Sequence, residues 1–258
     1  MGLRSEVAAA TNAAVRATRF EFEKRFWIIC AIYFAGFCLF GYTPFIAALR
    51  HLSAPSVMPG TPEAERFARL VVLFGSLLVF LAAALRTWGA AYLRTKIVHD
   101  ASQHSEALVA DGPFRYTRNP LYLATLPMAA GIGVLASQSG FIFLVLANWI
   151  FVYRLILREE ESLLKTQGES YQAYCQVVPR FWPAVTPRVP AGNRRPQWLQ
   201  AFGGESFVWI FGVAELLVAI TLRPLAALIV FPLGFLAHFA ITHRIQKHRK
   251  NSSDVAKV

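Results

Sequence analysis

The 258-residue chain is 55% hydrophobic and only 16% charged, with a mean hydropathy of +0.43 and a formal net charge of +11. A soluble domain carries about 25% charged residues, so this chain has too few to cover a surface that faces water. The composition excludes a disordered chain, a collagen, a coiled coil and an ordinary cytosolic enzyme. It predicts an all-α, polytopic membrane protein, whose basic surplus reflects cytoplasmic loops and not nucleic-acid binding.

The first 25 residues contain five basic and three acidic side chains and no apolar stretch before Phe26. This pattern does not fit a cleavable signal, and we expect a short amphipathic helix on the membrane surface. Six apolar runs follow, and each is a candidate for a span of roughly 20 residues. They are Phe26–Leu49, Leu70–Leu93, Leu121–Ala136, Phe141–Leu157, Phe207–Leu222 and Pro224–Ile241.

Short breaks predict that four of these runs form two helical hairpins. The polar tetrapeptide Ser137–Gly140 separates the third run from the fourth, and Arg223 separates the fifth from the sixth. With both termini in the cytoplasm, the inside segments hold 21 lysines and arginines, counting Arg154 near the cytoplasmic end of the fourth run, and the outside loops hold 4. This asymmetry predicts that orientation.

The strongest local motif is DGPFRYTRNPLY, residues 111–122, at the start of the third run. Gly112 and Pro113 favour a turn, and Asn119 followed by Pro120 is typical of a helix start with an Asn cap. Arginine and tyrosine at this position either anchor the helix at the membrane interface or form a polar site.

A second motif, Glu159-Glu160-Glu161, follows the fourth run. The acids are either a solvated charge run or carboxylates that bind a ribose diol or a cation. The short turn of the hairpin predicts that Glu159 and Glu160 return to the residues around Arg118 and Tyr122. Chemistry is therefore expected where these two motifs meet.

GPFRYTRNPLY, followed by EEESLLKTQGESYQAYCQVVPRFWP, resembles the superfamily of isoprenylcysteine carboxyl methyltransferases and phospholipid methyltransferases. The resemblance covers roughly residues 94–183, and Asn119 stands where the isoprenylcysteine branch has His. The matching residues are Gly112, Pro113, Arg118, Pro120, Tyr122, Glu159, Glu160, Leu163, Gly168, Tyr171, Tyr174, Arg180 and Pro183.

The resemblance implies an integral membrane methyltransferase that binds S-adenosylmethionine at the cytoplasmic face, without a Rossmann domain, and methylates a lipid or other lipophilic acceptor. Gly131 and Gly133 lie within a span and follow no strand, so they are not a dinucleotide fingerprint. The expected cofactor-binding residues are Tyr116, Arg118, Asn119, Pro120, Tyr122, Arg154, Glu159, Glu160 and Tyr171. Two other classes stay open: an NADPH-dependent reductase of the sterol-reductase type, and a non-enzymatic membrane protein.

Residues outside the motifs carry further expectations. Arg86, inside the second run, is a candidate catalytic residue with Glu160, either steering a polar headgroup or snorkelling to the interface. Glu215 is an acid within a span, with His238 as a possible partner. The histidine pairs at spacings of five, such as His99 and His104, do not share a helix face, so we expect no metal site.

Three segments are expected. Residues 1–93 hold the surface helix and two spans, 94–183 hold the methyltransferase core, and 184–258 hold a Pro-rich linker and the last two spans.

Overall fold

The computed structural model describes residues 15–41, 43–93 and 110–223, and of the C-terminal stretch residues 225, 229–230, 232–234, 236 and 238–240. Within these residues the chain is helical, and its only β-type pairing is an isolated bridge between Pro44 and Ser137. The elements are α2 (Arg19–Glu23), α3 (Arg25–Cys38), α4 (Phe45–Ser53), α5 (Pro62–Tyr92), η1 (Gly112–Arg115), α7 (Pro120–Gly133), α8 (Gln138–Val177) and α9 (Trp198–Thr221).

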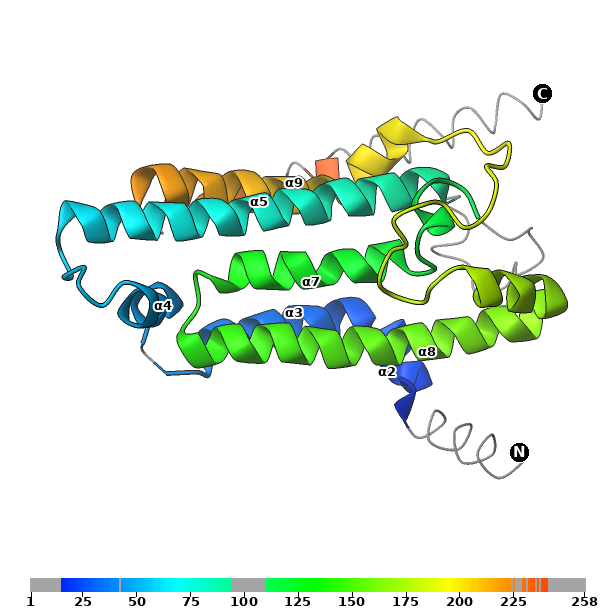
Figure 1. Ribbon diagram of the computed structural model, residues 1–258, viewed down its shortest axis with the longest axis horizontal. Coiled ribbons are helices and arrows are strands. Elements are labelled where there is room, and N and C mark those ends of the chain that lie inside the picture. The colour runs from blue at the N-terminus through cyan, green and yellow to red at the C-terminus, as the bar shows by residue number, and fades with distance from the viewer. Residues whose placement is uncertain are drawn as a thin grey trace.

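The helices α3, α5, α7, α8 and α9 run along the long axis of the molecule as a bundle (Figure 1). Helix α5 packs against α7 and α9, and α8 packs against α3 and α7. Helices α5, α8 and α9 are long and apolar enough to cross a membrane, and α3 and α7 are shorter apolar helices. The prediction of an all-α membrane bundle is therefore confirmed.

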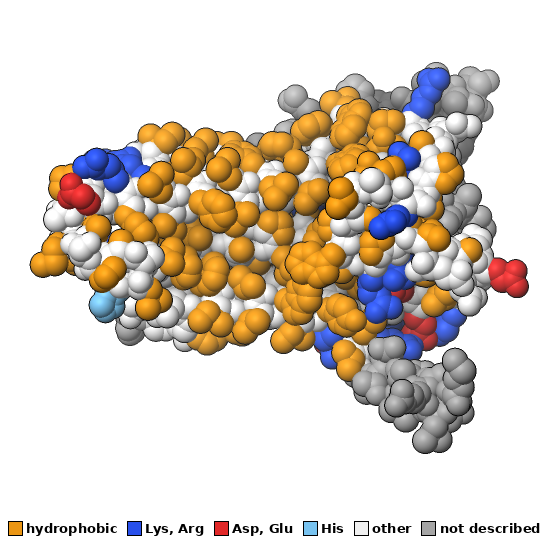
Figure 2. Space-filling view, in the orientation of Figure 1, with side chains coloured by type: hydrophobic (Ala, Val, Ile, Leu, Met, Phe, Trp, Pro, Cys, Tyr) orange, Lys and Arg blue, Asp and Glu red, His pale blue; other side chains and the backbone are white. Residues whose placement is uncertain are grey.

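The surface of the bundle has the character expected for contact with lipid. Hydrophobic side chains cover the long middle of the visible face, and charged side chains gather at its two ends (Figure 2). On α5, Leu70, Phe74, Leu77 and Leu81 are all at least half exposed and follow one another at helical spacing. In water such a stripe would be costly, whereas acyl chains are as apolar as the leucines themselves.

The first apolar run differs from the expected single span. Helix α3 ends at Cys38 and α4 begins only at Phe45, so a break divides Phe26–Leu49. The break contains Gly41 and Pro44, and a proline cannot donate the hydrogen bond that a helix interior needs. The Phe45 amide instead donates to Ala136 O at 3.0 Å. The break is thus held against the connection between α7 and α8.

The predicted hairpin of the third and fourth runs is formed by α7 and α8. Pro120 is the first residue of α7, and Ser137 caps α8 by accepting from the Gly140 amide at 3.0 Å. Helix α8 continues well past the apolar run to Val177 and changes direction at Gly168, where φ is +56°. Glycine tolerates this conformation without steric cost.

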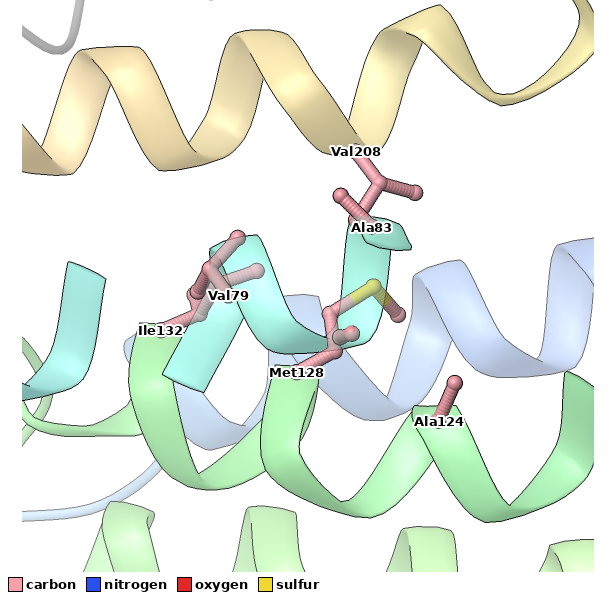
Figure 3. Packing of buried hydrophobic residues seen from close by; sticks show 7 residues of the cluster. Val79, Ala83, Ala124, Met128, Ile132 and Val208 are labelled. Carbon is pink, nitrogen blue, oxygen red and sulfur yellow. The ribbon is translucent and has the colours of Figure 1, made fainter. Parts of the chain in front are cut away.

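Small residues let the central helices approach closely. Val79 and Ala83 of α5, Ala124, Met128 and Ile132 of α7, and Val208 of α9 form one buried cluster, with Val79 beside Ile132 and Ala83 beside Val208 (Figure 3). A Cβ on Gly131 would lie 2.5 Å from the carbonyl oxygen of Gly75. Gly131 therefore permits the crossing of α5 and α7, as expected for small residues in membrane helices.

The sixth run, Pro224–Ile241, lies only partly within the described residues. Of that run, Val230 packs against the cluster of Val72, Ala214, Val218 and Ala219, and His238 lies beside Ser206 near the start of α9. The earlier residue, Val230, lies beside the end of α9, and the later residue, His238, lies beside its start. This order is that of an antiparallel hairpin.

Candidate functional site

The segment before α7 is fastened to the segment after α8. Gly112 has a φ of +58°, and the short helix η1 carries the chain to Thr117. Thr117 Oγ1 donates to Phe181 O at 2.8 Å, and the Arg118 amide donates to Pro179 O at 2.9 Å. These bonds bring the two predicted motifs to one end of the bundle, where α7 begins.

Glu160 is the centre of the polar network at this end. Its Oε1 accepts from Asn119 Nδ2 at 3.0 Å and lies 3.3 Å from Arg118 Nη1, and its Oε2 accepts from Arg180 Nε at 2.9 Å. Glu160 is 4% exposed, so these three donors compensate a charge that has left water. The predicted meeting of the residues around Arg118 with Glu160 is confirmed.

Asn119 occupies the cap position of α7 but does not use its side chain as a cap. Its Nδ2 donates instead to Glu160 Oε1 and to Arg180 O, the latter at 2.9 Å. Because Pro120 has no amide hydrogen, the start of α7 needs one acceptor fewer. The side-chain amide of Asn119 therefore joins the start of α7 to Glu160 on α8 and to Arg180 in the segment after α8.

Glu159, the neighbouring acid, points to a different partner. Its carboxylate is hydrogen-bonded with the hydroxyl of Tyr122, one turn into α7. Tyr122 packs against two apolar clusters, one of which contains Leu155 and Phe151 of α8. The two adjacent acids thus hold α7 at two points.

The Arg118 side chain also contacts the far part of α8, near the tyrosines of the second motif. Arg118 Nη1 donates to Cys175 Sγ at 2.7 Å. Tyr171 and Tyr174 shortly precede Cys175 in the sequence, and their ring centres are 5.9 Å apart. Tyr174 donates to Phe114 O at 2.7 Å. Arg118 Nε is buried and has no hydrogen-bond partner among the described residues.

Tyr116 lies at the edge of this arrangement. Its ring is 5.9 Å from that of Trp88 on α5, and its carbonyl accepts from the Ala184 amide at 2.9 Å. Tyr116 therefore connects the site to α5 and to the Pro-rich segment.

Two residues of the network were missing from the expected site. Arg180 had a signal, because it belongs to the ending of the motif that carries the family resemblance. Cys175 had none, since a lone cysteine on a helix is usually a packing residue.

Arg154, an expected cofactor residue, lies on another face of α8. Its Nη2 donates to both oxygens of Glu21, at 2.8 and 3.0 Å. Nearby, Arg158 donates to Ala17 O at 3.0 Å and Arg16 pairs with Glu161. The N-terminal segment is thus bound along α8, and Arg154 belongs to that contact.

The pKa of the Glu21 carboxyl lies below its usual range. The main cause is the Thr18 amide, which donates to the carboxyl at 2.6 Å. Burial opposes this effect, and the Arg154 guanidinium adds to it, so that the pKa is lowered overall. The carboxyl is therefore ionised in the folded protein well below neutral pH.

Arg86 lies apart from the Glu160 network. Its Nε is 2.6 Å from Glu205 Oε2 and its Nη2 is 3.3 Å from Glu205 Oε1, so the two side chains form a two-point ion pair between α5 and α9. The guanidinium also lies 5.7 Å from the ring centre of Phe207. Sequence reasoning missed Glu205, which lies just before the expected start of the fifth span.

Glu215 is almost completely buried, at 1% exposure, and neither carboxylate oxygen has a hydrogen-bond partner among the described residues. His238, its expected partner, has its Nδ1 2.8 Å from Ser206 Oγ instead. No group of three or more potential metal ligands occurs in the part of the chain that the structure describes. His99, His104, His243 and His248 lie outside that part.

Comparison with known proteins agrees with the family resemblance. Residues 70–169, from within α5 to just past the bend of α8, match the sequence model of the family described as phospholipid methyltransferase. The chain is thus similar, over less than half of its length, to a family of methyltransferases, and its helices are apolar enough for a membrane protein. Arg180 and Glu205 lie beyond the matched segment.

Two curated proteins are similar to part of the chain. The cobalt-zinc-cadmium resistance protein CzcN of Cupriavidus metallidurans is 25% identical over 117 residues, which are 45% of this chain and 51% of that protein. The nickel-cobalt-cadmium resistance protein NccN of Alcaligenes xylosoxydans xylosoxydans is 25% identical over 112 residues, 43% and 49% of the two chains. The similarity thus spans about half the length of each relative. No solved structure matches the chain.

Proposed function

We propose that this protein is an S-adenosylmethionine-dependent methyltransferase that acts on a lipid or other lipophilic acceptor at the cytoplasmic face of a membrane. The observation that carries the proposal is the network in which Glu160 holds Arg118, Asn119 and Arg180 together. This network joins the two motifs that resemble the methyltransferase superfamily, and most of it lies within the segment that matches the family.

The side chains at the site suit the polar ends of such a cofactor. Arg118 Nε is a buried donor without a partner among the described residues, and a carboxylate is the group an arginine binds best. We propose Arg118 for the methionyl carboxylate, with Tyr116, Asn119, Pro120 and Tyr171 around it. Arg154 is a weaker candidate because Glu21 already binds its guanidinium.

We propose different roles for the two neighbouring acids, Glu159 and Glu160. Both carboxylate oxygens of Glu160 already accept hydrogen bonds from protein side chains. We therefore propose that Glu160 positions Arg118 and Asn119. Glu159 has the Tyr122 hydroxyl as its partner and is our candidate for the ribose or the ammonium group. When bound, the cofactor supplies an electrophilic methyl group on a sulfonium. The task of these residues is to hold and orient it against the acceptor, which can account for much of the rate.

The proposed topology has six spans with both termini in the cytoplasm. The basic asymmetry of 21 to 4 supports it, and so does the position of the site, which lies at the end of the bundle where α2 is found (Figure 1). A lipophilic acceptor would lose about 0.8 kcal/mol for each CH₂ exposed to water. We therefore propose that it arrives from the bilayer between the helices, while the cofactor arrives from the cytoplasm.

Isothermal titration of the detergent-solubilised full chain with S-adenosylmethionine and with NADPH tests this proposal. We expect saturable binding of S-adenosylmethionine, and none of NADPH. Binding of NADPH alone would favour the reductase, and binding of neither by folded protein would favour a non-enzymatic role.

The names of the two relatives support a second, separate role. Both are named as metal-resistance proteins, and we propose that methylation by this protein contributes to metal tolerance. Growth of a deletion strain at graded cadmium, zinc and cobalt concentrations tests it. Rescue by the wild-type chain but not by Glu160→Gln would connect tolerance to the proposed site, and unchanged tolerance in the deletion would reject the role.

A further inference from the structure

An aromatic cluster lies beside the Glu160 network, on α8 and the segment that follows it. The ring centre of Trp149 is 4.8 Å from that of Phe181, 6.1 Å from that of Trp182 and 6.5 Å from that of Tyr153. Trp182 is 67% exposed, so the cluster is open to the surroundings. Tryptophan and tyrosine gather where a membrane meets water, because their rings are apolar at one end and polar at the other.

Arg180 places a positive charge at this cluster. Its Nε is bound to Glu160, and its Nη1 lies 3.3 Å from the Tyr153 hydroxyl. Among the described residues its Nη2 has no hydrogen-bond partner, and the side chain is 37% exposed. Burial lowers the pKa of the guanidinium, but the charge and hydrogen bond of Glu160 outweigh this and raise it overall.

An apolar stripe on α8 extends away from the cluster. Ile142 and Leu146 are 50% and 54% exposed, and they precede Trp149 by seven and three residues. Residues at these spacings lie on one face of a helix. The stripe covers about 10 Å of helix length at 1.5 Å per residue, which is room for a substantial part of an acyl chain.

We propose that Arg180, Tyr153 and Trp182 bind the phosphate-bearing headgroup of a membrane phospholipid, whose acyl chain lies along Trp149, Leu146 and Ile142. An arginine with an unused N–H is suited to a phosphate oxygen, and such charge-assisted bonds are the strong ones. The apolar stripe leads from the charge into the bilayer, as the two parts of a phospholipid require. The site goes beyond the proposed methyl transfer, because the lipid lies on the exposed face of α8 and does not have to be the methyl acceptor.

Quenching of tryptophan fluorescence by brominated lipids tests the site in the full chain in detergent micelles. The chain has six tryptophans, so the signal of Trp182 is obtained as the difference between wild type and Trp182→Phe. We expect brominated phosphatidylglycerol to quench Trp182 at a concentration roughly tenfold or more below that of brominated diacylglycerol, because the diacylglycerol lacks the charged hydrogen bond. In Trp198→Phe, which removes a tryptophan that is 45% exposed on α9, this preference should persist.

Equal quenching of Trp182 by the two lipids in folded wild type would overturn the proposal. So would displacement of the phospholipid by soluble glycerol phosphate at similar concentration, since a free anion site needs no acyl chain.

Arg180→Gln should abolish the preference, and Arg180→Lys should keep part of it. Because Arg180 also supports Glu160, Tyr153→Phe is the second variant: it leaves that ion pair and the reporter in place. We expect Tyr153→Phe to weaken the preference several-fold, and an unchanged preference in both Arg180→Gln and Tyr153→Phe would contradict the site.

Discussion

Arg180 Nε lies 2.9 Å from Glu160 Oε2, although one residue is on α8 and the other follows the end of that helix. The pair closes the extension of α8 back onto the start of α7, where Asn119 occupies the other carboxylate oxygen. The carboxylate that the family resemblance implied for cofactor binding is thus bound by protein donors on both oxygens. This relation makes Glu160 a positioning residue in our account.

Glu160→Gln should weaken S-adenosylmethionine binding by about 1–3 kcal/mol, the range for loss of a hydrogen bond to a charged group. The amide replaces an acceptor by a donor, which then faces the donors of Arg118 or Arg180. Glu161→Gln is the matched control, because Glu161 is the next residue and, among the described residues, its ion pairs are with Arg16 and Lys165 at the surface. Isothermal titration measures both, and equal affinities in the two variants would remove Glu160 from the site.

Asn119→Asp should destabilise the protein more than Asn119→Ala does. The aspartate places a like charge beside Glu160 and removes the donor that now lies 3.0 Å from it, whereas alanine removes the donor alone. We expect about 1–3 kcal/mol for the alanine variant, the cost of leaving a buried acceptor short of a partner. Thermal unfolding in detergent compares them, and a more stable aspartate variant would contradict the network.

The contact between the N-terminal segment and α8 should depend on pH. Because the pKa of Glu21 is lowered in the folded protein, the ionised carboxylate stabilises the fold above the unfolded-state pKa, and this stabilisation is lost as the pH falls through the folded-state pKa. Unfolding temperatures of wild type and Glu21→Gln should therefore differ at neutral pH and converge in acid. Glu65→Gln, at the other end of the bundle, is the control. A difference that grows as the pH falls would have the wrong sign.

Arg86 and Glu205 should be strongly coupled. Removing one partner of a buried ion pair leaves an uncompensated charge and costs about 3–5 kcal/mol, whereas replacing both by apolar residues costs much less. Arg86→Leu and Glu205→Leu should each be more destabilising than the double replacement. Additive effects in this cycle, measured by thermal unfolding, would show that the pair at 2.6 Å is not formed.

The proposed orientation predicts opposite labelling of two exposed serines. In a variant without its native cysteines, a cysteine at Ser56 should react with an impermeant maleimide from outside the cell, and one at Ser170 should react only after the membrane is opened. Both positions are exposed, at opposite ends of the bundle. Reaction of both from the outside would reject the topology.

Hydropathy and motif spacing predicted the parts of the structure that depend on neighbours in sequence. The short turn before Gln138 was enough to pair α7 with α8, and so to bring Arg118 close to Glu160. The family resemblance also included Arg180, but the sequence alone did not predict that its side chain would bind Glu160.

The pattern could not predict how each helix is rotated about its axis. Arg154 therefore faces Glu21 instead of the cofactor site, and Arg86 faces Glu205 across α5 and α9, which are far apart in sequence. The sequence analysis also failed to predict the break after Cys38, because the residues across it are apolar. Hydropathy does not take into account that Pro44 interrupts a helix.

Transfer of an isotopically labelled methyl group tests the central claim most directly. Purified full-length protein is incubated with membrane lipids and labelled S-adenosylmethionine, and the lipid extract is analysed by mass spectrometry. We expect labelled lipid with wild type and Glu161→Gln, and at least tenfold less with Glu160→Gln. Folded wild-type protein that leaves every lipid unlabelled, or equal labelling by Glu160→Gln, would contradict this account.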